Sequence, residues 1–328
     1  MFSCKVINKI LKFYNGKPLI IEGANGSIGL SFLYIFKEYS IKPSPLILST
    51  YASKLDDGWL RFDPNIIHIK ASEEGFSKKR SSLLKKMKHI NVIYCSGYGR
   101  PGIFLNDPKS VINTNISNLV EYSEIENISS FAYMSTSELY SGLEGEANED
   151  SILPTSPQHP RGVYIESKRL GEAIVENIIG NNVPRVASYR VALAFPPKLL
   201  DRDNRVMADL IQNAWRDGVV TLNGGESYIR QYQYGPNCAR KILASMALGS
   251  STLYNNSGSH IITLGDLARL IGEILGLNVK IKETSADSSA PRSVLVNSQR
   301  LNTECNYQTD QELSLAEYIT EMINGKSI

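Results

Sequence analysis

A tyrosine and a lysine four residues apart, Tyr164 and Lys168, are the residues of this chain best suited to chemistry. On a helix, side chains at this spacing project from one face about one turn apart. An ammonium beside a phenol favours phenolate and lowers a tyrosine pKa below its usual value of about 10. Such a base could take the proton of a sugar or alcohol hydroxyl while a nicotinamide takes the hydride. The alternative is a packed ring and a solvated amine on an ordinary amphipathic helix.

A glycine-rich turn near the start of the chain is the second chemical feature. It follows a short apolar run at 18–22 and precedes an apolar helix predicted at 28–39. Glycine allows the tight turn, the backbone approach to a pyrophosphate and close helix–strand packing, while the helix N-terminus attracts the anion. A plain strand-to-helix turn is the alternative, but this context favours dinucleotide binding. The predicted cofactor contacts are Gly23, Asn25, Gly26, Ser27, Ile28 and Gly29.

The second predicted strand ends without the carboxylate that usually binds the ribose of NAD. Its end reads Leu-Ser-Thr-Tyr-Ala-Ser-Lys, and the first acid is Asp56. Hydroxyls with one lysine suit a ribose 2′-phosphate better than a bare diol. We therefore predict that Ser49 and Lys54 contact the cofactor and that NADP is favoured slightly over NAD, with both left open.

Composition excludes several classes of protein. The 328 residues carry a net charge of +2, with 42% hydrophobic and 21% charged residues, as in an ordinary globular protein. We expect no nucleic-acid or membrane partner, and no apolar run approaches the length of a membrane span. The four cysteines and four histidines are scattered and show no metal-ligand spacing, so we predict no metal site and free thiols in the cytoplasm.

Short apolar strands alternate with helices along the first part of the chain. Strands are predicted near 18–22, 45–48, 91–95, 131–134 and 185–193, with helices at 110–124 and from Tyr164 to about Gly180. This alternation is typical of an α/β fold, a Rossmann-type doubly wound parallel sheet. We assign it to residues 1–190, with 1–17 as an N-terminal extension whose short helix packs on the body or on a partner subunit.

Beyond Pro196 the pattern becomes mixed. Helices are predicted at 206–216 and 264–275, and short strands at 219–222 and 279–282. We assign residues 191–328 to a smaller mixed α/β C-terminal domain, from which 232–256 is expected to return to the first.

These motifs together resemble the extended short-chain dehydrogenase/reductase family, in its NAD-dependent epimerase/dehydratase branch that modifies nucleotide sugars. The glycine turn has the family spacing, although Ser27 replaces a common aromatic. The segment 91–97 resembles the fourth strand beneath the nicotinamide ribose and implies contacts from Cys95 and Ser96, although the usual His-Leu-Ala-Ala ending is absent. Asn115 matches the helix asparagine of the family, which the resemblance also places against the cofactor.

The resemblance also implies a catalytic set. The run Ser-Thr-Ser-Glu-Leu-Tyr at 135–140 matches the active-site strand end, and Tyr164 and Lys168 match the catalytic pair. Tyr164 would remove the proton from the hydroxyl on sugar carbon 4, with Lys168 tuning it and binding the cofactor ribose. Thr136, or Ser135 beside it, would share that proton, and Glu138 would act at the adjacent carbon.

Several departures leave the reaction subclass open. One dehydratase group has an aspartic acid where this chain has Ser137. Decarboxylases hold the substrate carboxylate with an arginine at the position of Val294, where only Arg100 or Arg161 could take its place. An epimerase or dehydratase is the leading prediction. The alternatives are a nucleotide-sugar decarboxylase, a 4-keto-sugar reductase, a reductase of small ketones or lipids, and a non-catalytic NAD(P)-binding regulator.

The C-terminal domain is implied to bind the nucleotide sugar. The run 224–230 and the pair Pro291-Arg292 resemble segments whose arginines meet the diphosphate, and Arg205 falls where the family binds the nucleotide. Arg205, Arg230 and Arg292 are therefore the predicted substrate-binding residues, since cations in one cleft suit a diphosphate. By resemblance alone, we also expect a homodimer formed through two helices on the flank of the sheet.

Overall fold

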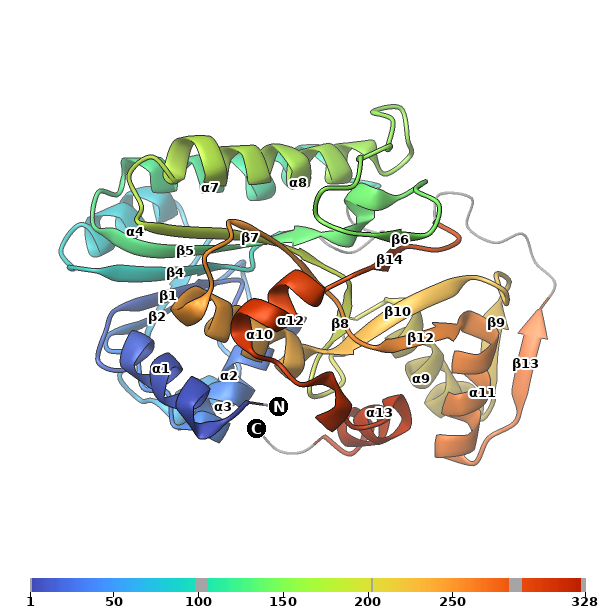
Figure 1. Cartoon of the computed structure of the whole chain (residues 1–328). Coiled ribbons are helices and arrows are strands. Elements are labelled where there is room, and N and C mark those ends of the chain that lie inside the picture. Colours follow the sequence, from blue (N-terminus) through green and yellow to red (C-terminus); the bar gives the residue numbers. More distant parts are fainter. Residues whose placement is uncertain (1, 98–104, 202, 283–290, 326–328) are drawn as a thin grey trace.

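The computed structural model describes residues 2–97, 105–201, 203–282 and 291–325, and its centre is a seven-stranded sheet (Figure 1). All neighbouring strands pair in parallel, in the order β3-β2-β1-β4-β5-β7-β11. The strands are β1 (Leu19–Glu22), β2 (Leu46–Thr50), β3 (Ile67–Lys70), β4 (Ile90–Tyr94), β5 (Ile128–Thr136), β7 (Arg185–Val191) and β11 (Leu253–Asn256). The predicted α/β fold with a Rossmann-type sheet is confirmed.

Helices cover both faces of this sheet (Figure 1). One face carries α4 (Phe76–Leu84), α6 (Pro108–Ile112), α7 (Asn118–Val120) and α8 (Gly162–Ile174), and the other carries α1 (Cys4–Tyr14), α2 (Ser27–Tyr39), α3 (Asp57–Phe62), α10 (Gly235–Leu248) and α12 (Gln299–Cys305). Two apolar clusters fill the two interfaces, as expected for strands buried on both sides.

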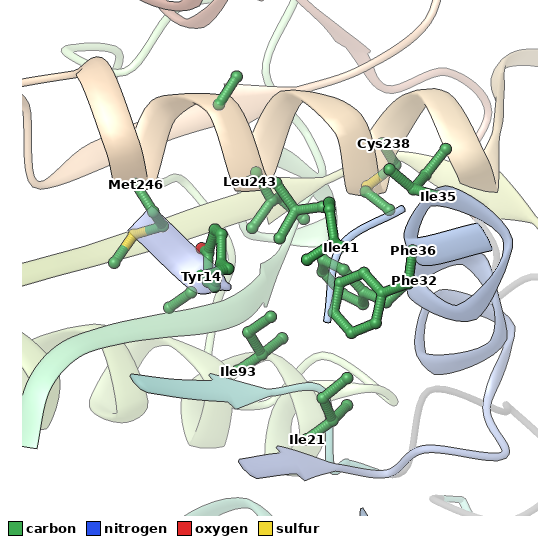
Figure 2. Close-up of a cluster of buried hydrophobic side chains, with 14 of the residues drawn as sticks. Tyr14, Ile21, Phe32, Ile35, Phe36, Ile41, Ile93, Cys238, Leu243 and Met246 are labelled. Atoms are coloured by element: carbon green, nitrogen blue, oxygen red, sulfur yellow. The ribbon is translucent and has the colours of Figure 1, made fainter. Parts of the chain in front are cut away.

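The core between α2 and α10 holds the nucleotide-binding turn in place. In Figure 2, Leu243 of α10 and Phe32 and Phe36 of α2 lie over Ile21 and Ile93 of the sheet. All five side chains are fully buried. Because α2 begins at the glycine turn, its packing against α10 sets where the helix N-terminus points.

The N-terminal extension forms the helix α1, as predicted. It packs against α10 and buries Val6, Ile10 and Tyr14, which lie on one face at helical spacing. Of the two alternatives, packing on the body is the one that the structure shows.

A second, smaller part lies beside the carboxyl ends of the central strands (Figure 1). It contains a three-stranded sheet, two two-stranded sheets and helices around a separate apolar core. Its elements are β8 (Leu193–Phe195), β10 (Ile229–Tyr234), β12 (His260–Thr263), β9 (Val220–Asn223), β13 (Val279–Lys282), β6 (Glu146–Ala147), β14 (Leu295–Val296), α9 (Val206–Asp217), α11 (Leu264–Leu275) and α13 (Leu315–Ile323).

The chain crosses between the two parts several times. After β10, helix α10 packs on α2 and β11 pairs with β7, and later α12 packs on α10. The strand β6, which precedes α8 in the chain, pairs within the smaller part with β14 near residue 295. Segments of both parts therefore surround the ends of β1, β4 and β5, which is where ligands bind in open α/β sheets.

Candidate active site

The glycine turn has the geometry of a phosphate-binding loop. Gly23 has φ +78°, and a Cβ on it would lie 3.0 Å from the carbonyl carbon of Cys95. A Cβ on Gly29 would lie 2.4 Å from the carbonyl oxygen of Gly23. Only glycine fits these two positions, and helix α2 then begins at Ser27 after the N-cap Gly26, whose lack of a side chain leaves the helix start without a side-chain cap. This cradle fits a dinucleotide pyrophosphate.

The structure brings the glycine turn and the predicted catalytic residues to one cavity of about 240 Å³. From the glycine turn, the start of α2 and the segment just after β4, the residues that line it are Gly23, Gly26, Ser27, Ile28, Gly29, Cys95 and Gly97. From β5, the turn after it and α8 it is lined by Met134, Ser135, Thr136, Ser137, Glu138, Tyr164 and Lys168. Residues more than 140 positions apart in the sequence thus meet as predicted.

The Tyr164 hydroxyl forms a hydrogen bond with Thr136, at the end of β5. Thr136 Oγ1 also accepts a hydrogen bond from the backbone N–H of Glu138 at 3.2 Å. Burial, followed by the charge of Glu138, raises the pKa of Tyr164 well above its usual value, while Thr136, Arg161 and Arg205 act to lower it. The expectation of a pKa below 10 is therefore wrong for the protein alone, because burial outweighs the nearby cations.

Lys168 is fixed beside the same cavity. Its Nζ donates to the carbonyl oxygen of Met134 at 2.8 Å, and burial lowers the pKa of Lys168 from 10.5 to about 8. A Cβ on Gly97 would lie 2.9 Å from this Nζ, so the missing side chain at Gly97 leaves room for the amine. That Lys168 tunes Tyr164 stays a prediction.

Asn115 lies in a π-helical turn, Asn113–Ser117, that interrupts the helix predicted at 110–124. Such turns are rare and occur often at functional sites. Its Nδ2 donates to Ser167 Oγ at 2.8 Å, and its Oδ1 is buried without a hydrogen-bond partner among the described residues. An unpaired buried acceptor next to Gly97 is consistent with a bound group that supplies a donor.

The two hydroxyls at the end of β5 have different surroundings. Ser135 Oγ donates to Glu172 Oε1 at 2.6 Å, and Glu172 in turn pairs with Arg190 at 2.8 Å. Thr136 instead faces Tyr164. Of the two candidates, Thr136 is placed to share a substrate proton. Glu172 was not predicted as part of this region, and no local pattern in the sequence indicates it.

A second cavity of about 380 Å³ opens next to the first and is lined largely by the smaller part of the chain. Glu138, Asp203 and Arg205 are among the residues that line both cavities. Arg161, Arg230 and Val294 line the second one. All the catalytic residues predicted from the sequence therefore line the first cavity, and Glu138 alone among them also lines the second.

The three predicted substrate arginines occupy different positions. Arg205 bridges the two parts of the chain: it donates to Ser27 Oγ at 2.6 Å and to the carbonyl oxygen of Ala194 at 2.7 Å, and it pairs with Asp203. Arg230 donates to the carbonyl oxygen of Pro291 at 3.0 Å at the edge of the second cavity. The side chain of Arg292 is exposed and does not line either cavity. All three roles stay predictions.

The end of β2 is joined to the glycine turn through backbone atoms. The carbonyl oxygen of Ser49 accepts hydrogen bonds from the N–H groups of Gly23 and Ala24. Asn25 does not line the cavity and instead holds the next loop, donating to Ser53 Oγ and to the carbonyl oxygen of Lys54.

The described part of the chain contains neither a metal-binding cluster nor a membrane-spanning helix. Within residues 2–97, 105–201, 203–282 and 291–325, no group of three His, Cys, Asp or Glu side chains could hold a metal ion. In the same ranges no helix is long and apolar enough to span a membrane. Arg100, one of the arginines considered for a substrate carboxylate, lies outside the described residues.

The fold and the glycine cradle define a Rossmann-type dinucleotide-binding protein with a second part placed over the carboxyl ends of the strands. The chain belongs to the NAD dependent epimerase/dehydratase family, whose model matches residues 62–255. Two curated relatives are UDP-glucuronic acid decarboxylase 1 of Xenopus tropicalis, 25% identical over 48% of this chain, and that of Arabidopsis thaliana, 22% identical over 79%. The matched parts span 38% and 60% of those relatives.

Solved structures show the same fold at low sequence identity. The epimerase Mth375 of Methanothermobacter thermautotrophicus has a TM-score of 0.79 and 16% identity, covering 97% of this chain and 94% of its own. The UDP-glucuronic acid 4-epimerase of Bacillus cereus, in complex with UDP-glucuronic acid and NAD, has a TM-score of 0.75 and 18% identity, covering 93% and 97%. DesIV, a dTDP-glucose 4,6-dehydratase of Streptomyces venezuelae, has a TM-score of 0.77 and 14% identity, covering 94% and 96%.

Proposed function

We propose that this protein modifies a nucleotide sugar by NAD(P)-dependent oxidation at sugar carbon 4, followed by a step at the adjacent carbon. The observation that carries the proposal is the meeting of Tyr164, Thr136 and Glu138 in the glycine-lined cavity, with Glu138 also lining the second cavity. A base beside the cofactor and a carboxylate facing the substrate side suit a two-step reaction of the epimerase or dehydratase type.

The residues present fit a dinucleotide, because the glycine turn leaves a cradle that a Cβ would fill. Bound NAD(P)⁺ would supply the hydride acceptor. The N-terminus of α2 would hold the pyrophosphate, with Ser27 and Arg205 beside it. Tyr164 takes the hydroxyl proton at its phenol oxygen, and Thr136 orients that hydroxyl through its bond to the same oxygen. Lys168, held by Met134, would bind the ribose.

Decarboxylation of a uronic acid is the second candidate, favoured by the two curated relatives. Val294 lines the second cavity at the position where the resemblance to decarboxylases requires an arginine. An apolar side chain cannot pair with a substrate carboxylate. Arg161 lines it too, but its guanidinium is bonded to Glu138 at 2.9 Å. These contacts favour a sugar without a carboxylate.

A substrate panel tests the proposal. The protein, loaded with NAD⁺ or NADP⁺, is incubated with UDP-glucose, UDP-N-acetylglucosamine, dTDP-glucose and UDP-glucuronic acid, and the products are identified by mass spectrometry and NMR. We expect an epimer or a product that has lost water from one of the three neutral sugars. Loss of carbon dioxide from UDP-glucuronic acid alone would establish the decarboxylase instead, and cofactor binding with no turnover of any sugar would support the regulator.

A preference for NADP is a separate prediction of this proposal. Lys54 is exposed at the end of β2, whereas Asp56, the nearest acid, is paired with Lys198 at 2.6 Å. We expect Lys54→Glu to weaken NADPH binding about tenfold, the size of one charge-assisted contact, and to leave NADH binding nearly unchanged. Titration calorimetry with both cofactors measures this, with Lys17→Glu as the surface control. Equal losses for both cofactors would contradict it.

We also propose that the protein is a homodimer in the cytoplasm. Ile112 and Val120, on the segmented helix α6–α7, and Leu170 and Ile178, on or just after α8, are exposed apolar residues on the flank of the sheet. We expect Leu170→Glu to convert the dimer to a monomer, because it places a charge in an apolar interface. Light scattering measures the mass, and Leu313→Glu, at an exposed site elsewhere, is the control. A monomeric wild type would overturn the proposal.

A further inference from the structure

We propose that Arg161 is a positioning residue that holds Glu138 at one oxygen and leaves the other oxygen as the proton acceptor for the second step. This inference rests on the proposed function and deepens it, because it assigns a role to a side chain that binds Glu138 from the start of α8. It concerns what happens at the carbon next to carbon 4.

The backbone fixes Arg161 where α8 begins. Arg161 is the N-cap residue of that helix, and its N–H donates to His159 Nδ1 at 3.1 Å. The next residue is Gly162, where a Cβ would lie 2.3 Å from the carbonyl oxygen of Pro157. This tight approach sets the start of the helix, one turn before Tyr164. Arg161 and the predicted base therefore belong to one rigid element.

Glu138 is fixed from the other side. It lies in the 3-10 turn Ser137–Tyr140, and its N–H donates to Thr136 Oγ1. Thr136 thus contacts both the backbone of Glu138 and the hydroxyl of Tyr164. The carboxylate can still rotate about its own side-chain bonds, so its orientation depends on the contacts of its oxygens.

Only one of those oxygens is occupied. Arg161 Nη1 donates to Glu138 Oε1 at 2.9 Å, and the two side chains are 7% and 22% exposed. Glu138 Oε2 is buried and has no hydrogen-bond partner among the described residues. Buried polar atoms normally have partners, and an unpaired one in a cleft indicates a group that arrives with the ligand. Glu138 lines both cavities, so that group would come from the substrate.

The charges around the pair support the same assignment. Glu138 and Arg161 act in opposite directions on the pKa of Tyr164, and also on that of Arg230 on β10, whose pKa burial lowers. Glu138 therefore lies close enough to Tyr164 and to Arg230 for its charge to act on both. Without the guanidinium, its carboxylate would be free to turn toward the Tyr164 hydroxyl and compete with Thr136 for it.

The step itself moves one proton. After oxidation, carbon 4 is a ketone and the neighbouring C–H bond is acidified. The proton goes to Glu138 Oε2, and the electron pair of the broken C–H bond moves to the carbon 4 oxygen as an enolate. Return of a proton to the opposite face inverts that carbon and gives an epimer. Loss of hydroxide from the carbon beyond it, which leaves as water with the proton held by Glu138, gives a dehydrated sugar. In both cases the sugar would regain the hydride from the bound cofactor. Arg161 takes no proton in this sequence.

Two readouts on one sample separate the steps. The holoenzyme is mixed with the most active sugar of the panel in deuterium oxide, and reduced nicotinamide is followed by absorbance while deuterium uptake into the sugar is followed by NMR. We expect Arg161→Met to keep formation of reduced nicotinamide within about threefold but to slow deuterium uptake about 100-fold, the usual size of a general-base effect. Arg161→Lys and added guanidinium should each restore part of the uptake.

Arg169→Met is the matched control, because Arg169 lies on the same helix and pairs with Glu166 at 3.4 Å at the surface. It should leave both readouts unchanged, and guanidinium should not rescue Glu138→Gln. Equal losses of both readouts in Arg161→Met, or unchanged deuterium uptake, would overturn this inference alone. Absence of reduced nicotinamide in the wild type would overturn the proposed function, and this inference with it.

Discussion

Replacement of Tyr164 by phenylalanine is expected to lower kcat by about 100- to 10,000-fold, the range that general-base catalysis contributes. The substitution removes one oxygen atom, which bonds Thr136 and faces the cavity shared with the glycine turn. The ring stays buried against Val111, Leu139 and Ile165, so the fold has little reason to change. Initial rates with the best sugar of the panel measure the effect, and thermal unfolding confirms the fold.

The raised pKa of Tyr164 gives this prediction a dependence on pH. Since the phenol is protonated at neutral pH in the protein alone, the rate should rise with pH wherever formation of the phenolate limits it. Tyr318→Phe, which removes a buried hydroxyl bonded to Asn237 in the smaller part, is the control and should retain activity. If Tyr164→Phe also retains activity, Tyr164 is not the base.

The sequence predicted those parts of the site that depend on local patterns. Gly23, Gly26 and Gly29 follow from one turn between a strand and a helix, and Tyr164 and Lys168 from one helical spacing. The strands with continuous apolar runs were found for the same reason. The edge strand β3 was missed, since only its Ile69 is fully buried and its pattern is correspondingly weak.

The contacts that set the chemistry could not be predicted in this way. Arg205 and Ser27 are separated by 178 residues, and Arg161 and Glu138 by 23, and neither pair has a periodic signal. The direction of the Tyr164 pKa also depends on burial, which neighbouring residues in the sequence do not report. The spacing of Tyr164 and Lys168 in the sequence indicated a base. How strongly burial raises the pKa of Tyr164 is decided by the fold.

The buried ion pair between Glu172 and Arg190, beside the end of β5, should be a sensitive point for stability. Arg190 Nη2 lies 2.8 Å from Glu172 Oε2, with side chains 6% and 12% exposed, and Arg190 Nη1 also donates to the Tyr140 hydroxyl at 2.7 Å. We expect Arg190→Met to lower the free energy of unfolding by about 3–5 kcal/mol, because it leaves the charge of the buried Glu172 carboxylate without its cation. Urea unfolding measures the change.

The double variant Glu172→Met/Arg190→Met distinguishes two costs. One is the cost of leaving the Glu172 charge buried without its cation, and the other is the loss of the attraction between the two charges. With both charges gone no ion remains buried, so we expect it to regain much of the stability that Arg190→Met loses. Arg216→Met, which breaks an exposed pair with Asp217, should change the free energy of unfolding far less, because solvent screens that pair. A loss in Arg190→Met as small as in Arg216→Met would show that solvent reaches the pair. In that case the hydrogen bond from Ser135 to Glu172 would not hold the serine hydroxyl in place. Ser135 would then again be a candidate, like Thr136, for the hydroxyl that shares the substrate proton.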